Sequence, residues 1–307
     1  MEKNRIAVIS LTMNDHYKIK EWRKWFDEYK EDVDSFIIVD NNSENIFQEE
    51  LRSIFPEATI IELGYNGGCT GAYNCGISKA LSDKNITHIA LVGNDIRLEK
   101  GALKKCVEIL EENEVLGMVA PVLLNADSDI VGDYGCSISK NLTLIPYGIG
   151  MKYGQLGESF RYCDAVTGGM NVSKRSFYET VGLQDNKLFM YSDEVDMGIR
   201  AKKSGFALGV TKEAKSWHQH INPGGASKRL PFSSYLISRN KVYLARKHFG
   251  LLRAVQVFFV FVAKSFKGLC KSTIRRQFDW YKDYNWMLIG AAKGLFNDMR
   301  PNRYSSL

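Results

Sequence analysis

Three carboxylates lie close together in the segment FMYSDEVDMGIR, namely Asp193, Glu194 and Asp196. A helix that begins here needs one cap, and the hydroxyl of Ser192 can accept a hydrogen bond from a backbone N–H. Asp196 and Arg200 are four residues apart, so they can pair on one helix face. Asp193 and Glu194 remain unexplained, and a carboxylate at the edge of a pocket can act as a general base. By itself the segment is better explained as a capped amphipathic helix, but the rest of the chain favours a catalytic role.

Two histidines, His218 and His220, lie two residues apart in the segment WHQHINPGG. On a strand or an extended loop this spacing places both side chains on one face. Histidine is a common metal ligand, and two histidines near carboxylates are candidate metal ligands. A lone histidine is usually structural, and one acid at a strand end can simply cap a turn. Asp95, which follows the apolar run His88–Val92, is therefore open to either role, and the two histidines are candidates for a metal site.

The segment GYNGGCTGAYNCG carries five glycines, at positions 64, 67, 68, 71 and 76. Glycines let the backbone approach a ligand closely. A glycine-rich loop that opens a helix can also present N–H groups to a phosphate. The spacing fits neither the Walker motif nor the dinucleotide-binding motif. The loop is therefore a candidate ligand-binding loop of another type.

Strand-like and helix-like segments alternate along the first half of the chain, which predicts an α/β fold with a parallel sheet. The expected strands are Ile6–Leu11, Phe36–Val39, Thr59–Leu63, His88–Val92, Gly117–Val122 and Ala207–Val210. The expected helices are Tyr17–Tyr29, Glu99–Leu110, one after the glycine-rich loop and one around Phe177. Residues 125–155 are expected to be irregular or to form a hairpin. Ligands of such sheets bind outside the carboxyl ends of the strands. The polar segment DNNS follows the second strand and is therefore a candidate ligand contact, but its residue types are also those of a plain turn.

The chain after Pro231 has a helical pattern and a strongly basic end. From Leu251 onward it contains ten Lys or Arg residues and three Asp residues, while the whole chain carries a net charge of +6. The apolar run Val257–Ala263 is too short to span a bilayer. Basic helices with interleaved Trp and Tyr commonly lie in a membrane interface. We expect this region to bind an anionic membrane surface, or else to pack on the catalytic body or on a second subunit of a homodimer.

Composition narrows the remaining classes of function. The chain has 307 residues with 45% hydrophobic and 25% charged residues, as in soluble globular proteins. Its six cysteines form no CxxC pair, so zinc-knuckle and redox motifs are not expected. The first residues do not form a signal peptide, which predicts a cytoplasmic protein with reduced thiols. Confinement of the basic surplus to the C-terminal end argues against general nucleic-acid binding.

Taken together in their order along the chain, the segments resemble those of the family 2 inverting glycosyltransferases of the GT-A fold. The resemblance is strongest to the rhamnosyltransferase-like bacterial subgroup. The ordered elements are the strand before Thr12, then VDNNS, NGGCTGAYNCG, Asp95, TGGM, FMYSDEVDMGIR and the WH pair. The subgroup also shares SRNKVYLARK and a helical tail. The resemblance implies a Rossmann-like, mostly parallel sheet flanked by helices. It also implies a catalytic domain over residues 1–235 and a helical, basic amphipathic region over residues 236–307.

The resemblance also implies roles for individual residues. The base and ribose of a nucleotide-sugar donor would contact Thr12, Asn14 and Asp40. Further donor contacts would come from Asn66, Gly67, Asn94, Asp95, Gly168 and Gly169. The metal, Mg²⁺ or Mn²⁺, would be held by Asp95 and His218, with His220 as the alternative. The chain departs from the family where Gly93 replaces the first acid of the DxD motif.

The implied reaction is transfer of a sugar with inversion. Glu194 would act as general base with Asp193 beside it, in the order DE where the family has ED, and the two carboxylates would raise each other's pKa. The expected donor is dTDP-rhamnose and the expected acceptor a lipid-linked glycan of a bacterial surface polysaccharide, at the inner face of the cell membrane. Alternatives are UDP-galactofuranose, UDP-glucose or UDP-galactose as donor, or a catalytically silent nucleotide-sugar-binding protein. A nucleotidyltransferase would need a basic residue in the first phosphate loop, and the glycine-rich loop has none.

Overall fold

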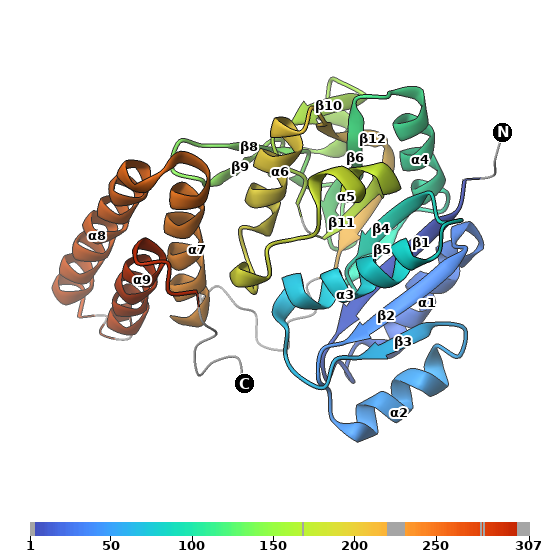
Figure 1. Ribbon diagram of the computed structural model, residues 1–307, viewed down its shortest axis with the longest axis horizontal. Helices are drawn as coiled ribbons and strands as arrows, with labels where there is room; N and C mark the ends of the chain where they lie inside the picture. The colour runs from blue at the N-terminus through green and yellow to red at the C-terminus, as the bar shows by residue number, and fades with distance from the viewer. Residues whose placement is uncertain (1–3, 168, 220–230, 277, 279, 300–307) are drawn as a thin grey trace.

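The structure is a computed structural model that describes residues 4–167, 169–219, 231–276, 278 and 280–299 (Figure 1). Its centre is a ten-stranded sheet with the order β10-β12-β6-β11-β4-β1-β2-β3, in which β5 pairs with β12 and β7 with β6. One half is parallel and consists of β4, β1, β2 and β3. These strands are β1 (Ile6–Thr12), β2 (Ser35–Asp40), β3 (Thr59–Glu62) and β4 (His88–Val92). The expected α/β sheet is therefore present.

The other half of the sheet mixes strand directions. Strand β11 runs antiparallel to both β4 and β6, whereas β6 and β12 are parallel to each other. The bounds are β5 (Ile96–Leu98), β6 (Leu116–Asn125), β7 (Val131–Asp133), β10 (Phe160–Cys163), β11 (Met170–Lys174) and β12 (Ala207–His218). The reversal at β11 brings the start of that strand, and the glycine before it, to the same edge as the end of β4.

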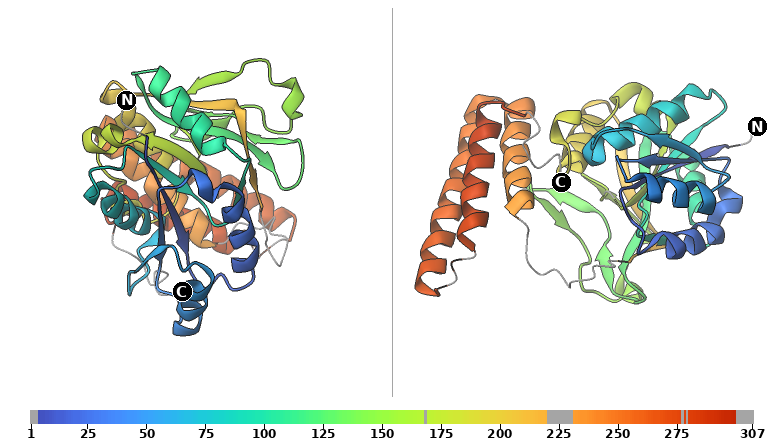
Figure 2. Two further views of the ribbon diagram at one scale, coloured as in Figure 1. Left: turned by 90° about the vertical axis from the view of Figure 1, so that its right-hand side faces the viewer. Right: turned by 90° about the horizontal axis from the view of Figure 1, so that it is seen from below.

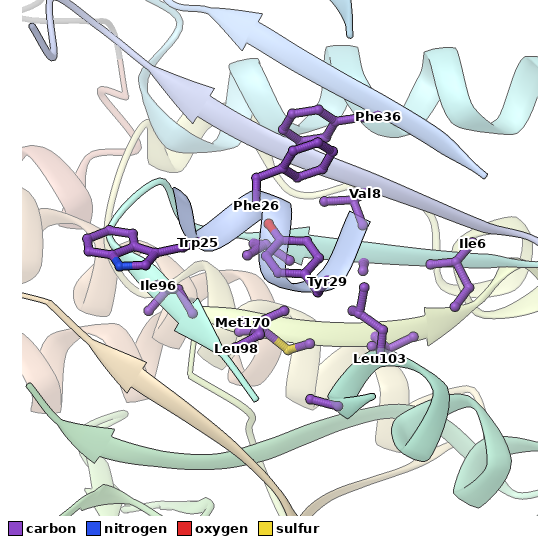
Figure 3. Close-up of a cluster of buried hydrophobic side chains, with 14 of the residues drawn as sticks. Ile6, Val8, Trp25, Phe26, Tyr29, Phe36, Ile96, Leu98, Leu103 and Met170 are labelled. Atoms are coloured by element: carbon purple, nitrogen blue, oxygen red, sulfur yellow. The ribbon is translucent and has the colours of Figure 1, made fainter. Parts of the chain in front are cut away.

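Helices cover both faces of the sheet because each buries one apolar face against it (Figure 1). One face carries α1 (Ile19–Tyr29), α2 (Asn45–Ile54) and α4 (Ala102–Glu112). The other carries α3 (Gly68–Ser82), α5 (Arg175–Val181) and α6 (Asp193–Lys203). On the first face the rings of Phe26 and Phe36 stack with centroids 4.0 Å apart, beside Trp25, Tyr29 and Met170 (Figure 3).

Three C-terminal helices form a bundle beside the sheet domain (Figure 2). They are α7 (Pro231–Phe249), α8 (Leu251–Ile274) and α9 (Trp280–Leu295). In α9, Gly290 and Gly294 let the helix approach α7, because a Cβ at either position would clash with the carbonyl oxygen of Tyr235 or Arg239. The hairpin of β8 (Cys136–Ile138) and β9 (Leu144–Pro146) reaches the bundle and buries Leu142 in its core. Among the described residues, no helix is both long and apolar enough to cross a membrane.

Most expected elements are present, and the differences have local causes. The short strand expected at Ala207–Val210 continues to His218, because its polar second half pairs with β6 and β5. Helix α2 and strands β5 and β10 were not predicted, and the hairpin expected within residues 125–155 is present as β8 and β9. The expected domain boundary after residue 235 lies inside α7, and the division into two domains stays a prediction.

Candidate active site

The residues predicted to contact the nucleotide base and the ribose lie at the carboxyl ends of β1 and β2. Thr12 pairs with Asp40 in the sheet register, and Asn14 accepts a hydrogen bond from Glu44 N at 2.8 Å. The Asp40 carboxylate is fully buried and accepts hydrogen bonds from Ser43 N at 3.2 Å and from Gln48 Nε2 at 2.8 Å. Asp40 thus shapes the turn after β2, and its direct contact with a nucleotide base stays a prediction.

The carboxylate of Asp15 ties the ends of β1 and β4 together, a role that the sequence analysis did not identify. It accepts hydrogen bonds from Thr12 Oγ1 at 3.1 Å and from Asn94 Nδ2 at 2.7 Å. The ammonium of Lys18 lies 3.1 Å from its second oxygen. Lys18 also lowers the pKa of Asp95, so its positive charge reaches the predicted metal ligand. The signal available in the sequence was the polar run NDH directly after an apolar strand.

The glycine-rich loop packs against the turn after β2 and also against the acidic segment. Asn66 Oδ1 accepts hydrogen bonds from Asn41 Nδ2 and from Gly68 N, each at 3.0 Å. Gly68 has φ +66°, and a Cβ there would clash with the carbonyl oxygen of Phe189. That carbonyl oxygen also accepts a hydrogen bond from Thr70 N at 3.2 Å. The glycine at this position is required because the two segments touch backbone to backbone.

The structure brings the predicted metal ligands Asp95 and His218 together. His218 lies at the end of β12, paired in register with Ile96, and its Nε2 is 3.1 Å from Asp95 Oδ2. Burial opposes ionisation of Asp95, but its hydrogen bond to His218, together with the charges of His218 and Lys18, outweighs burial, and the pKa of Asp95 is below its ordinary value. An ionised carboxylate oxygen beside an imidazole nitrogen is a donor set that fits Mg²⁺ or Mn²⁺. The part of the chain that the structure describes has no cluster of three or more such ligands.

Gly93 replaces the first acid of the DxD motif at a crowded position. Its N–H donates to the carbonyl oxygen of Gly169 at 2.9 Å, which places that glycine, a predicted donor contact, beside the end of β4. A Cβ at position 93 would lie 2.8 Å from Asp95 Oδ1 and 3.2 Å from Ile96 Cγ1. An acid here would therefore displace the Asp95 carboxylate from its present position.

The acidic segment begins helix α6 with an unusual backbone. Phe189, Tyr191 and Ser192 have φ of 64°, 69° and 65°, in a region that side chains other than glycine seldom adopt. Ser192 is the N-cap residue, but its hydroxyl makes no capping hydrogen bond, so the predicted capping role is wrong. A left-handed cap turns the hydroxyl away from the helix N–H groups. Strained backbone of this kind is often found at functional sites.

Two buried side chains of α7 hold this strained loop, and they belong to the SRNKVYLARK segment. Asn240 Nδ2 donates to the carbonyl oxygens of Leu188, Met190 and Tyr191 at 3.0, 2.9 and 2.8 Å. Arg239 is 1% exposed and donates to the carbonyl of Leu188 at 3.0 Å. The C-terminal bundle therefore positions the acidic segment, a role that sequence pattern did not reveal.

Asp196 anchors α6 to the rest of the protein. The predicted pair with Arg200 is confirmed at 2.8 Å, and the same carboxylate accepts from Lys247 Nζ and contacts His248 Nε2, each at 2.7 Å. Burial of the Asp196 carboxylate opposes ionisation, but these partners outweigh it and hold its pKa well below the usual range. Asp196 is thus a structural acid, which separates it from Asp193 and Glu194.

Asp193 and Glu194 line a small internal cavity of about 30 Å³ together with Asn171, Tyr178 and Gln184. Burial raises the pKa of Asp193 to about 6, whereas a hydrogen bond with Glu194 lowers it. The expected mutual increase between the two acids is therefore wrong for Asp193, because desolvation is the main cause of its shift. A polar cavity of this size has room for a water molecule.

Asp193→Asn is expected to increase the unfolding free energy at pH 7. The pKa of Asp193 is raised in the folded state, so protonation of this side chain stabilises the fold. This contribution to the unfolding free energy is complete below the unfolded-state pKa near 4 and is lost as pH rises through about 6. The amide removes this loss, worth roughly 1–3 kcal/mol at pH 7. Urea unfolding of both proteins at pH 4 and pH 7 measures it. A difference that does not change with pH would contradict the raised pKa.

The carboxylates of both predicted sites act on one thiol of the glycine-rich loop. The pKa of Cys69 is raised to about 12, first by burial and then by the negative charges of Asp193, Glu194 and Asp95. The predicted metal ligand and the predicted base therefore both act electrostatically on the glycine-rich loop, although they are about 100 residues apart in the chain. The remaining predicted residues, Gly168 and the alternative ligand His220, lie outside the described residues.

Comparisons with known proteins show related sequences over part of the chain. Residues 23–142 match the family described as Glycosyl transferase family 2. The low-salt glycan biosynthesis hexosyltransferase Agl10 of Haloferax volcanii is 23% identical over 61% of this chain and 59% of its own length. The N-acetylglucosaminyl-diphospho-decaprenol L-rhamnosyltransferase of Mycobacterium tuberculosis is 21% identical over 72% of this chain and 77% of its own. The match therefore spans less than two thirds of the haloarchaeal protein.

Solved structures show the same fold. GalNAc-T7 with UDP, GalNAc and Mn²⁺ superposes with a TM-score of 0.62 and 11% identity over 79% of this chain and 48% of its own. The mannosyltransferase PcManGT of Pyrobaculum calidifontis, with GDP-Man and Mn²⁺, has a TM-score of 0.56 and 13% identity over 96% of this chain and 88% of its own. Residues 23–142 thus match the family 2 glycosyltransferase model, and the chain has the GT-A fold of these solved glycosyltransferase structures.

Proposed function

We propose that this chain is a metal-dependent, inverting glycosyltransferase that moves a sugar from a nucleotide sugar to a lipid-linked glycan acceptor. The observation that carries the proposal is that Asp193 and Glu194 line one cavity with Leu91 of β4, the strand that leads to Asp95, beside the ends of the parallel strands. Ligands of open α/β sheets bind at this edge. The Mn²⁺ in the names of both structural neighbours, with UDP and GalNAc in one and GDP-Man in the other, supports the same type of site.

The residues of the site have distinct tasks in this reaction. Glu194 accepts the proton of the attacking acceptor hydroxyl as that oxygen bonds to the anomeric carbon. Displacement in line with the departing nucleoside diphosphate inverts the configuration at that carbon. Asp95 and His218 would hold the divalent metal, which when bound supplies positive charge for the leaving diphosphate. Lys18, through its charge near Asp95, adds to the positive potential on the donor side.

The proposed donor is dTDP-rhamnose, because the mycobacterial relative is named as an L-rhamnosyltransferase. UDP-galactofuranose, UDP-glucose and UDP-galactose are the alternatives. A screen of these four donors for metal-dependent binding and slow hydrolysis tests the assignment, with Mg²⁺ and Mn²⁺ compared. Tight binding of one donor with turnover supports the enzyme. Binding without hydrolysis or transfer under every condition favours a silent sugar-nucleotide-binding protein, the class to which the missing acid at Gly93 points.

We also propose that α8 attaches the protein to an anionic membrane surface. The outward side of α8 carries Leu252, Phe259 and Phe266, which are 75%, 60% and 70% exposed. Lys264, Lys267 and Lys271 of the same helix are exposed as well. Apolar side chains bordered by lysines suit a helix that lies in the interface plane. Each basic residue near such a surface contributes about 1 kcal/mol, so several suffice for reversible attachment.

The full chain is expected to float with anionic vesicles at low salt and to float less at high salt, because salt screens the attraction. Vesicle flotation in a density gradient measures this. Neutral vesicles are the lipid control, and a variant with Phe259→Ser and Phe266→Ser, whose charges are unchanged, tests the apolar contribution. A full chain that ignores anionic vesicles at every salt concentration would contradict membrane attachment and favour a packing or dimer surface.

A further inference from the structure

A cavity of about 410 Å³ lies between the acidic segment and the C-terminal bundle. Glu194 and Ser192 form one part of its wall, and Val257, Val260 and Lys264 of α8 form another. Its volume is within the range of ligand-binding pockets, roughly 300–1,000 Å³. The predicted general base therefore belongs to a cavity whose other walls come from outside the sheet domain.

The walls of this cavity are fixed by contacts between the hairpin and the bundle. Residues 141–144 at the hairpin tip line it, and Lys241 Nζ of α7 donates to Thr143 Oγ1 at 2.8 Å. Arg253 of α8 donates to the carbonyl oxygen of Lys140. Leu142 is buried in the core of the bundle. The cavity is therefore preformed, and none of these contacts involves the predicted donor residues.

The wall combines three chemistries that one ligand must match. Glu194 can take a proton from a hydroxyl, Lys241 and Lys264 carry positive charge, and Val257 and Val260 are apolar. A sugar supplies the hydroxyl, a diphosphate matches two ammonium groups, and an isoprenoid chain suits the apolar part. A peptide or a free oligosaccharide would leave the lysines or the apolar wall unmatched.

We propose that this cavity is the acceptor site and that it takes a sugar carried on a lipid diphosphate. Lys241 and Lys264 bind the diphosphate, the sugar hydroxyl faces Glu194, and the first isoprene units lie along α8. This inference rests on the proposed function, because it names the residues that select the acceptor of that reaction. Val260 lines the cavity while remaining 42% exposed. The lipid can therefore leave the cavity at the surface of α8 that is proposed to face the membrane.

Lys264→Gln tests the assignment. The Kd of an acceptor probe is measured for this variant and for the wild type in detergent, in the absence of a nucleotide-sugar donor. The probe is N-acetylglucosaminyl diphosphate on a farnesyl chain, the sugar diphosphate in the name of the mycobacterial relative. We expect its Kd to rise roughly tenfold, as for the loss of one charge-assisted hydrogen bond. The same sugar joined to farnesol without a diphosphate is expected to bind both proteins equally. Lys267→Gln, one helical turn further along α8 and outside the cavity wall, is the matched control and is expected to bind both probes like the wild type.

Lys241→Gln provides a second test, paired with Thr143→Val. The valine removes the hydroxyl that accepts from Lys241 but keeps the ammonium, so it separates a structural effect from loss of the diphosphate contact. We expect the glutamine variant alone to lose affinity for the diphosphate probe. Equal Kd values of the diphosphate probe for the wild type, Lys264→Gln and Lys241→Gln would overturn the assignment. No binding of that probe to the wild type would overturn it as well.

Transfer assays with the diphosphate probe separate the assignment of the acceptor cavity from the proposed transfer reaction. A wild type that transfers sugar to the diphosphate probe, with the same KM in Lys264→Gln, would contradict the cavity assignment and leave the glycosyltransferase function standing. Binding of the probe that depends on Lys264, without transfer from any donor in the screen, would support the cavity as a lipid-diphosphate site and contradict the proposed reaction.

Discussion

Glu194→Gln is expected to keep donor binding and to lower the rate of sugar transfer by roughly two to four orders of magnitude. The amide keeps the shape of the side chain and its ability to hydrogen-bond, but it cannot accept the proton of the acceptor hydroxyl. Glu194 lines both the internal cavity and the proposed acceptor cavity, so it stands between the two. Single-turnover kinetics with saturating donor, together with donor Kd values, separate loss of chemistry from loss of binding.

Asp193→Asn is the matched control for this prediction. Asp193 lines the internal cavity and is absent from the wall of the acceptor cavity, which makes it the poorer candidate for the base. We expect this variant to retain most of the transfer rate, with a moderate loss from altered positioning of Glu194. A Glu194→Gln protein near the wild-type rate, combined with an inactive Asp193→Asn protein, would move the base to Asp193.

The sheet domain was predictable from sequence because its signals are local. The apolar runs before Thr12, Asp40 and Asp95 predicted β1, β2 and β4 within one or two residues. Polar residues after these runs predicted the edge at which the candidate site lies. Strands β5 and β10 were missed because three or four residues carry too little periodicity to be recognised.

The support of the site was not predictable, because it depends on contacts between distant segments. Asn240 is 49 residues along the chain from the nearest of the loop carbonyls that it binds after α7 folds back on the acidic segment. The glycine at position 68 is explained only by the approach of Phe189. The segment containing Asn240 was recognised by resemblance, but its role as a clamp for a strained loop required the three-dimensional structure.

Asp95→Ala is expected to abolish metal-dependent donor binding while leaving the fold intact. Asp95 lies after β4 at the surface, where its side chain is 32% exposed, and its carboxylate contacts the imidazole of His218. Removal of this oxygen ligand leaves a single predicted ligand for the metal, which is too weak a site for Mg²⁺ or Mn²⁺. Calorimetric titration of the donor with and without Mn²⁺ measures the effect, and thermal unfolding reports on the fold.

Two further variants make the result specific to the metal. Asp95→Asn keeps the size of the side chain and a hydrogen bond to His218 but removes the negative charge, so it should lose metal dependence almost as fully. Gly93→Asp introduces the acid that the family motif places first. Because its Cβ would lie 2.8 Å from Asp95 Oδ1, we expect it to weaken metal-dependent binding in this chain. Donor affinity that responds to Mn²⁺ equally in the wild type and in both Asp95 variants would exclude Asp95 as the metal ligand.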